Sequence, residues 1–300
     1  MPYNNKMRSG ALIRLFRRSY GFSPTIRLAC MLVCYATLVC AQPAPPPQRI
    51  VSLNLCADQL LQALAEPQHI LGLSPLARDK ALSLYAAEAA HYRSVAPKSE
   101  ILLELKPDLV LLAPAGQELL RARLLEDGIP VLTVKGWNTL EDGDVQIREL
   151  ALRLGRQDQG EALIGKIRQA LQQSLQKPLD RHRTVLEIER RLYTPGRSSL
   201  IASLLQYWQI PNRADQPDLQ QGGFIALERL LMLKPDRLIV SNGNDGGSDP
   251  QGGDDMGLAL LRHPALRHSA LNMIDIPARL TLCGGPATIT LIETLSDALR

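Results

Sequence analysis

Short apolar segments alternate with amphipathic ones along most of the chain, beginning near residue 49. The apolar segments have the length of buried strands, and the segments between them show helical spacing. We expect the first four strands at residues 49–55, 69–75, 108–114 and 129–136. Short apolar strands that alternate with helices indicate a parallel sheet whose two faces are both covered.

Two longer helical stretches follow, over residues 139–154 and 158–176, and then the alternation starts again. Later strands are expected at residues 184–193, 236–242 and 271–277, before a closing helix over 287–300. The pattern therefore predicts an α/β protein with two Rossmann-like lobes, each a mainly parallel sheet flanked by helices. The lobes cover residues 49–155 and 183–300, and a single long helix within 156–182 connects them.

The first 41 residues differ from the rest of the chain in charge. They carry six basic residues and no acidic one, and they end in an apolar run, Leu28–Ala41. This order is typical of a secretory signal peptide, and Val39-Cys40-Ala41 fits its cleavage site. We expect cleavage after Ala41 and a Pro-rich lead-in over residues 42–48. The alternatives to cleavage after Ala41 are an uncleaved membrane anchor and a lipoprotein form at Cys40. The export route, Sec or twin-arginine, stays open.

Removal of this segment changes the charge of the protein. The 34 basic residues fall to 28, against 30 acidic residues, so the mature chain is near −2. This balance does not favour nucleic-acid binding. The chain contains no phosphate-binding loop, no dinucleotide fingerprint and no nucleophile elbow, and its five histidines show no zinc spacing. We expect no cofactor and no resident metal.

One pattern, Glu-x5-Lys-Pro-Asp followed by an apolar run, occurs twice, 128 residues apart. It begins at Glu100 and again at Glu228. In each copy the Glu opens a short helix, and the Pro disfavours helix at the Lys before it. An acid in a first helical turn is often explained by the helix dipole alone. Two matched carboxylates on two matched lobes also suit a partner with two-fold symmetry.

With these motifs, the chain resembles the periplasmic binding proteins of ABC importers for vitamin B12, ferric siderophores and haem. The resemblance rests on the segment RIVSLNLCADQLLQAL, both Glu-x5-Lys-Pro-Asp units, the connecting helix and the C-terminal strand and helix. It implies a monomeric periplasmic protein that holds a small-molecule metal chelate in a cleft between its lobes. It also implies that Glu100 and Glu228 dock onto the dimeric permease in the inner membrane.

In open parallel sheets, ligands bind beyond the carboxyl ends of the strands. Trp137 and Tyr193 are candidate flat contacts, and three arginines are candidates for binding carboxylate or phosphate groups. The full set of expected ligand-binding residues is Asn54, Cys56, Arg78, Asp79, Pro114, Trp137, Tyr193, Arg197, Phe224, Asn242, Arg279 and Cys283.

Two further features lie at expected strand ends. Cys56 and Cys283 fall in opposite lobes, and we expect unpaired thiols that line the cleft; pairing, ligand contact and metal binding are the alternatives. The Gly/Asp-rich loop over residues 241–255 is expected to act as a mobile lid rather than a Ca²⁺ site, because it lacks EF-hand spacing. The rival functions are a secreted two-lobed enzyme and a sensor that acts on a tetrapyrrole-like molecule.

Overall fold

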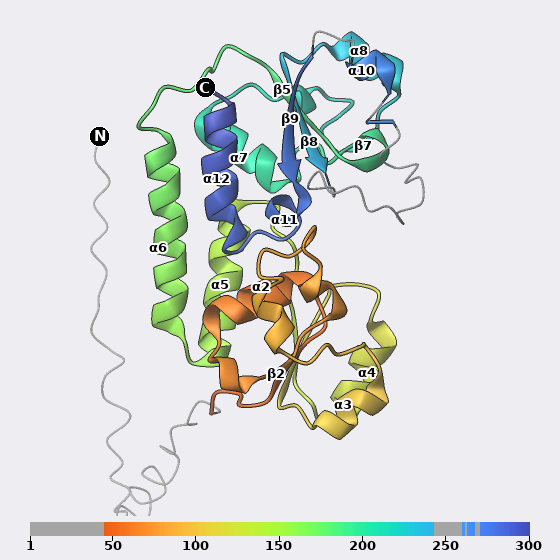
Figure 1. Cartoon of the computed structure of the whole chain (residues 1–300), viewed down its shortest axis with the longest axis vertical. Helices are drawn as coiled ribbons and strands as arrows, with labels where there is room; N and C mark the ends of the chain where they lie inside the picture. Colours follow the sequence, from red (N-terminus) through yellow and green to blue (C-terminus); the bar gives the residue numbers. More distant parts are fainter. Residues whose placement is uncertain (1–44, 243–259, 262, 268–270) are drawn as a thin grey trace, which may run out of the picture. The chain divides into compact units, whose positions relative to one another are not determined.

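The computed structural model describes residues 45–242, 260–261, 263–267 and 271–300 (Figure 1). Residues from Pro46 to Arg300 form one compact unit. The expected signal peptide and nearly all of the expected lid lie outside the described residues. In the described part of the chain, no helix combines the length and apolar character needed to cross a membrane.

The N-terminal lobe is built on a four-stranded parallel sheet with the order β2-β1-β3-β4. Its strands are β1 (Ile50–Ser52), β2 (Ile70–Gly72), β3 (Leu109–Leu112) and β4 (Val131–Thr133). Its helices are α2 (Leu55–Leu64), α3 (Ser99–Leu105) and α4 (Glu118–Glu126), with 3-10 turns at Pro67–His69, Pro75–Arg78 and Glu88–His91. The central strands β1 and β3 are buried throughout, as expected for a sheet covered on both faces, whereas the edge strand β4 is partly exposed.

The C-terminal lobe is built on a three-stranded parallel sheet with the order β5-β8-β9. Its strands are β5 (Val185–Ile188), β8 (Arg237–Asn242) and β9 (Asn272–Pro277), with a small antiparallel pair, β6 (Tyr193–Thr194) and β7 (Gly223–Phe224). Its helices are α7 (Leu200–Trp208), α8 (Leu227–Leu233), α10 (Pro264–Arg267), α11 (Ala278–Thr281) and α12 (Ala287–Ala298), with 3-10 turns at Arg190–Leu192 and Arg213–Asp215.

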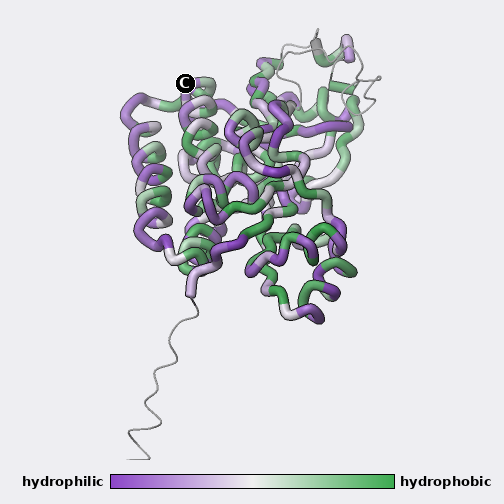
Figure 2. Tube along the Cα trace, turned by 60° about the horizontal axis from the view of Figure 1, so that its bottom comes forward, coloured by the Kyte–Doolittle hydropathy of each residue, from purple (hydrophilic) through white to green (hydrophobic). Residues whose placement is uncertain are grey.

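Two antiparallel helices, α5 (Leu140–Leu154) and α6 (Gln157–Ser174), lead from one lobe to the other (Figure 1). α5 begins with a capping box between Thr139 and Asp142, and the turn at Gly155 (φ 67°) ends it. α12 packs against α6, and one apolar core runs through both lobes and these helices. Figure 2 shows hydrophobic positions on the inner side of α6 and hydrophilic positions on its outer side. The connecting helix is therefore packed against both lobes.

The repeated pattern forms the same structure in both lobes. α3 and α8 each have seven residues, and each ends at a Lys in the left-handed conformation, Lys106 (φ 47°) or Lys234 (φ 42°). The Asp that follows the Pro accepts hydrogen bonds from the start of the neighbouring strand. Asp108 accepts from the Arg49 amide at 2.9 Å, and Asp236 accepts from the Thr184 amide at 2.7 Å. The Lys-Pro-Asp unit thus ends a helix and aligns two parallel strands.

The long strand expected at residues 184–193 is wrong in its second half. β5 ends at Ile188, and the chain then turns before β6. Arg191 (φ 60°) and Leu192 (φ 55°) both have positive φ, a conformation that cannot continue a strand. The apolar and charged alternation in this segment resembles a strand although the backbone bends there.

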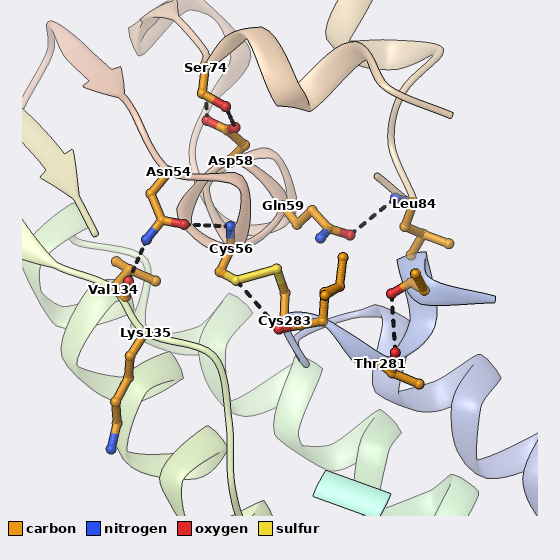
Figure 3. The surroundings of a disulfide bond; sticks show 12 residues. Asn54, Cys56, Asp58, Gln59, Ser74, Leu84, Val134, Lys135, Thr281 and Cys283 are labelled. Atoms are coloured by element: carbon orange, nitrogen blue, oxygen red, sulfur yellow. Dashed lines mark hydrogen bonds between the residues drawn. A yellow bond between two sulfur atoms is a disulfide. The ribbon is translucent and has the colours of Figure 1, made fainter. Parts of the chain in front are cut away.

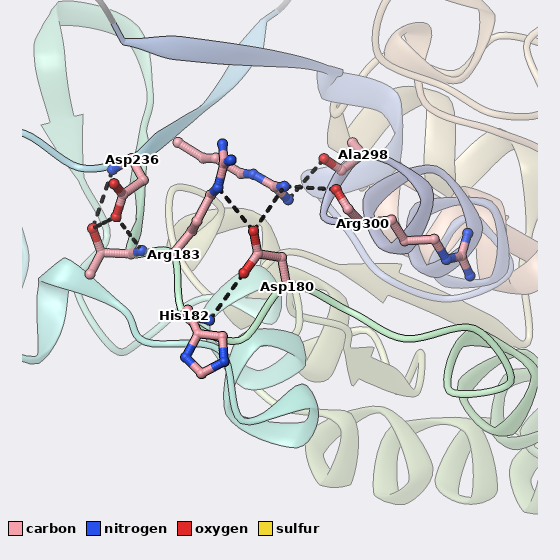
Figure 4. Close-up of polar contacts among 8 residues, drawn as sticks. Asp180, His182, Arg183, Asp236, Ala298 and Arg300 are labelled. Atoms are coloured by element: carbon pink, nitrogen blue, oxygen red, sulfur yellow. Dashed lines mark hydrogen bonds and ion pairs between the residues drawn. The ribbon is translucent and has the colours of Figure 1, made fainter.

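A buried arginine holds the C-terminus against the second sheet. Arg237, at the start of β8, is 4% exposed and donates to the carbonyl oxygens of Ala298 (3.1 Å) and Arg300 (2.8 Å). Asp180, in the segment after α6, lies 3.9 Å from the same guanidinium and 2.9 Å from that of Arg183 (Figure 4). These contacts join the end of the connecting segment to the last residues of the chain.

Candidate ligand-binding site

A cavity of about 360 Å³ lies beyond the carboxyl ends of β4 and β5, and residues of both lobes line it. The N-terminal lobe contributes residues 135–138, directly after β4. The C-terminal lobe contributes Glu187 and Glu189 from the end of β5, residues 198–201 at the start of α7, and the end of α11. This is the place where open parallel sheets bind ligands. Another cavity of about 350 Å³ is lined mainly by α5 and α6 instead.

Two acidic side chains stand on the wall from the C-terminal lobe. Glu187 is 4% exposed, and the Ser199 hydroxyl donates to its carboxyl group at 2.5 Å. Ser199 also accepts from the Ala202 amide and so caps α7. Burial raises the pKa of Glu187 to about 8, and the nearby Glu189 adds to this shift. Burial also raises the pKa of Glu189.

The sequence matches, over residues 50–269, the family model described as periplasmic binding protein. The chain is a periplasmic binding protein. The match covers most of both lobes and confirms the family that the two motifs indicated. Among curated proteins, none matches the chain by sequence.

Solved structures show the same two-lobed fold. A periplasmic haem binding protein from Pseudomonas aeruginosa shares 21% identity and a TM-score of 0.66, over 84% of this chain and 92% of that one. The periplasmic vitamin B12 binding protein of Vibrio cholerae shares 18% identity and a TM-score of 0.60, over 85% of this chain and 97% of that one. An ABC-type Fe³⁺-hydroxamate transport system protein from Saccharomonospora viridis shares 21% identity and a TM-score of 0.59, over 84% of this chain and 93% of that one. At these identities the likeness shows the fold alone.

Trp137 of the binding protein lines the cavity but is only 5% exposed. Its ring lies against Gly143 and Gly284, where an added Cβ would come within 2.6 and 2.4 Å of ring atoms. Its indole N–H has no acceptor within the described residues. The structure therefore embeds most of this residue in the wall, and the broad exposed ring face expected from its place after a strand is absent.

The expectation of unpaired cysteines is wrong, because Cys56 and Cys283 form a disulfide (Figure 3). Cys56 lies in the first turn of α2, and Cys283 follows α11, which brings their Cα atoms to 4.9 Å. The bond joins the two lobes beside the cavity. Thr281 and Leu282 line the cavity, whereas neither cysteine does. The bond is therefore next to the cavity wall without being part of the lining.

Asn54 and Asp58 hold the same turn of α2 in place (Figure 3). Asn54 accepts from the Cys56 amide at 2.9 Å and donates to the Val134 carbonyl at 2.5 Å, so its side chain is used within the protein. Asp58 accepts from the amide and hydroxyl of Ser74. Burial raises the pKa of Asp58 to about 6, although these hydrogen bonds oppose the shift.

An aromatic cluster occupies the β6–β7 pair. The rings of Tyr193 and Phe224 meet edge to face, 5.3 Å between centroids, and the Arg191 guanidinium lies 5.3 Å from the centre of the Phe224 ring. Phe224 is 68% exposed. These residues do not line the cavity itself, and Pro195, two residues after Tyr193, does.

The other expected ligand contacts are dispersed. Arg78 donates to the Tyr92 carbonyl at 2.5 Å, and Arg197 pairs with Asp215 at 2.7 Å. Asp79 caps its own turn, and Pro114 lines a separate cavity with Lys135. Arg279 lies in α11, whose end forms part of the cavity wall, and Asn242 ends β8.

The two glutamates of the repeated pattern occupy matching positions. Glu100 is the second residue of α3 and Glu228 the second residue of α8, and both are exposed. The carboxylates therefore project from equivalent helices of the two lobes. Within the described residues, no three His, Cys, Asp or Glu side chains gather in a way that would hold a metal ion.

Proposed function

We propose that this periplasmic binding protein captures a metal chelate (cobalamin, a ferric siderophore or haem) and delivers it to an ABC permease dimer in the inner membrane. The observation that supports this proposal best is the cavity at the strand ends, because residues of both lobes form its walls. The proposal includes export with cleavage after Ala41, lobes over 49–155 and 183–300, a monomeric state and binding without catalysis.

Ligand titration tests the binding step. The exported, processed protein is titrated with cyanocobalamin, haemin and a ferric hydroxamate, followed by calorimetry and by tryptophan fluorescence. We expect saturable binding of one compound and quenching, since Trp137 lies in the cavity wall. The ligand recovered after release should be chemically unchanged. Conversion of the ligand would support the enzyme alternative, and the absence of saturable binding to all three would contradict the proposal.

Docking is tested by the double variant Glu100→Ala/Glu228→Ala. We expect ligand affinity to stay the same while uptake by cells with the cognate permease is lost, because both carboxylates are exposed and neither residue lines the cavity. The matched control is Glu88→Ala/Glu293→Ala, which removes two exposed glutamates that lie outside α3 and α8. Equal uptake by both double variants would remove the docking role, and equal loss by both would show that only net charge matters.

A further inference from the structure

The cavity that would hold the ligand has an uneven distribution of charge. Its C-terminal wall carries Glu187 and Glu189, and among the described lining residues the basic one is Lys135. The Lys135 ammonium group already lies 3.1 Å from the Asp142 carboxylate, outside the cavity lining. A carboxylate on the ligand would therefore have to compete with Asp142 for this lysine, and it would face the Glu189 side chain.

The carboxyl groups of Glu189 and Glu187 differ in their surroundings. The Glu187 carboxyl group is held by the Ser199 hydroxyl. In the part of the chain that the structure describes, no hydrogen-bond donor or basic group contacts the Glu189 carboxylate. Its backbone is fixed, because its amide donates to the Tyr193 carbonyl at 2.7 Å. A half-buried carboxylate on a fixed backbone needs a donor, and a ligand in the cavity can supply it.

The lining also bears on how a metal could be held. Haem iron is bound in proteins by His, Tyr, Met or Cys thiolate. Among the described residues that line the cavity there is no His, Tyr, Met or Cys. The nearby cysteines are joined to each other and offer no thiolate. The described walls therefore offer hydrogen-bond acceptors to the periphery of a ligand rather than an axial ligand to its metal.

We infer that this cavity selects metal chelates whose periphery carries hydrogen-bond donors, such as the primary amides of cobalamin, over chelates that carry carboxylates, and that Glu189 is the residue that makes the selection. The inference rests on the proposed function. A primary amide donates to the Glu189 carboxylate, whereas a propionate or citrate carboxylate is repelled by it. A hydrogen bond to a charged group contributes enough to change affinity by about tenfold or more.

Two pairs of ligands test this selection. One pair is cyanocobalamin and its monocarboxylic acids, in which one primary amide is hydrolysed. The other is haemin and its bis-amide, in which both propionates are converted to primary amides. Within each pair the metal and ring stay the same. We expect the amide member of the pair that binds to be held about tenfold more tightly or better by the processed protein.

Variants connect the preference to one residue. Glu189→Gln should lower the affinity for the amide ligand by about tenfold and reduce the difference in affinity between the two members of each pair. The control Glu293→Gln, at an exposed position on α12, should leave both quantities unchanged. Matching thermal unfolding of the variants would show that the fold is intact. The inference would be overturned if the carboxylate member of a pair bound saturably and with the same affinity as the amide member, or if Glu189→Gln left the difference in affinity unchanged. Either result would leave the proposed function standing. Failure of all four ligands and of the ferric hydroxamate would instead overturn both.

Discussion

Removal of the Cys56–Cys283 disulfide is the most informative change to the stability of this binding protein. The bond closes a loop between residues 227 positions apart and joins the first turn of α2 to the segment after α11. In the chain-entropy model, a loop of this length lowers the free energy of folding by about 5 kcal/mol. For a chain of this size, that loss corresponds to a fall of about 10–20 °C in the midpoint of thermal unfolding.

The assay compares Cys56→Ser/Cys283→Ser with the wild type in urea and in thermal unfolding. Each single variant should lose as much stability as the double variant, because either substitution removes the same bond. Reductant should lower the stability of the wild type and leave the double variant unchanged, which separates the bond from a general effect of the reagent. Serine is close to cysteine in size, so the packing around the buried Cys283 is altered as little as substitution allows.

A loss below about 1 kcal/mol in the double variant would refute this reasoning, because it would mean that the bond does little to restrict the unfolded chain. Additive losses in the two single variants would also refute it, since they would indicate two separate packing effects. Thiol labelling of the exported, denatured protein gives an independent check. Two labelled cysteines per chain would show that the bond is absent.

Three smaller changes test other parts of the structure. Burial raises the pKa of Glu187 above its unfolded value to about 8, so its stabilising effect is complete below about pH 4.5 and is lost as pH rises toward 8. Wild-type stability should therefore fall by on the order of a few kcal/mol over this range, and Glu187→Gln should show a smaller fall in pH-dependent urea unfolding; parallel curves would contradict this. Gly284→Ala places a Cβ 2.4 Å from the Trp137 ring at φ 78° and should lower the free energy of unfolding by roughly 2 kcal/mol or more. Gly165→Ala, in an open part of α6, should raise the free energy of unfolding by about 1 kcal/mol. Thermal unfolding of both variants would show whether the space around the glycine decides the sign of the change. Ser174→Ala leaves the buried Trp208 N–H without the acceptor now at 2.9 Å and should cost about 1–3 kcal/mol, measured by urea unfolding; no loss would mean that another acceptor replaces it.

The sequence predicts the order of the elements well because the hydrophobic periodicity and the residues that end helices agree. The buried strands β1, β3 and β5 are mainly apolar, and the Lys-Pro-Asp units mark the ends of α3 and α8. Element limits are less predictable. β1 covers Ile50–Ser52 within an expected strand of seven residues, because Asn54 caps α2 and so ends the extended segment early. A capping residue and a strand residue look alike in a hydrophobicity pattern.

The cavity is less predictable than the fold, since it depends on which distant segments meet. The sequence places Trp137 after a strand but cannot show that two glycines allow its ring to be buried. The two cysteines fall in opposite lobes, and only the packing of α11 against the start of α2 brings them together. Glu187 was missed because it lies inside an apolar strand. An acid in the middle of a buried run is a signal that could have identified it.

The repeated and unrepeated parts of the chain suggest different kinds of partner. The Lys-Pro-Asp unit gives α3 and α8 the same length and the same ending, so Glu100 and Glu228 stand at equivalent positions of equivalent helices. Such duplication is useful for contact with a two-fold symmetric partner. The cavity walls have no such equivalence, because their described acids, Glu187 and Glu189, lie in β5 or directly after it, while Lys135 and Trp137 follow β4. An asymmetric wall suits one ligand in one orientation. If the proposed function holds, substitutions in the repeated unit should change delivery, and substitutions in the walls should change which chelate is bound.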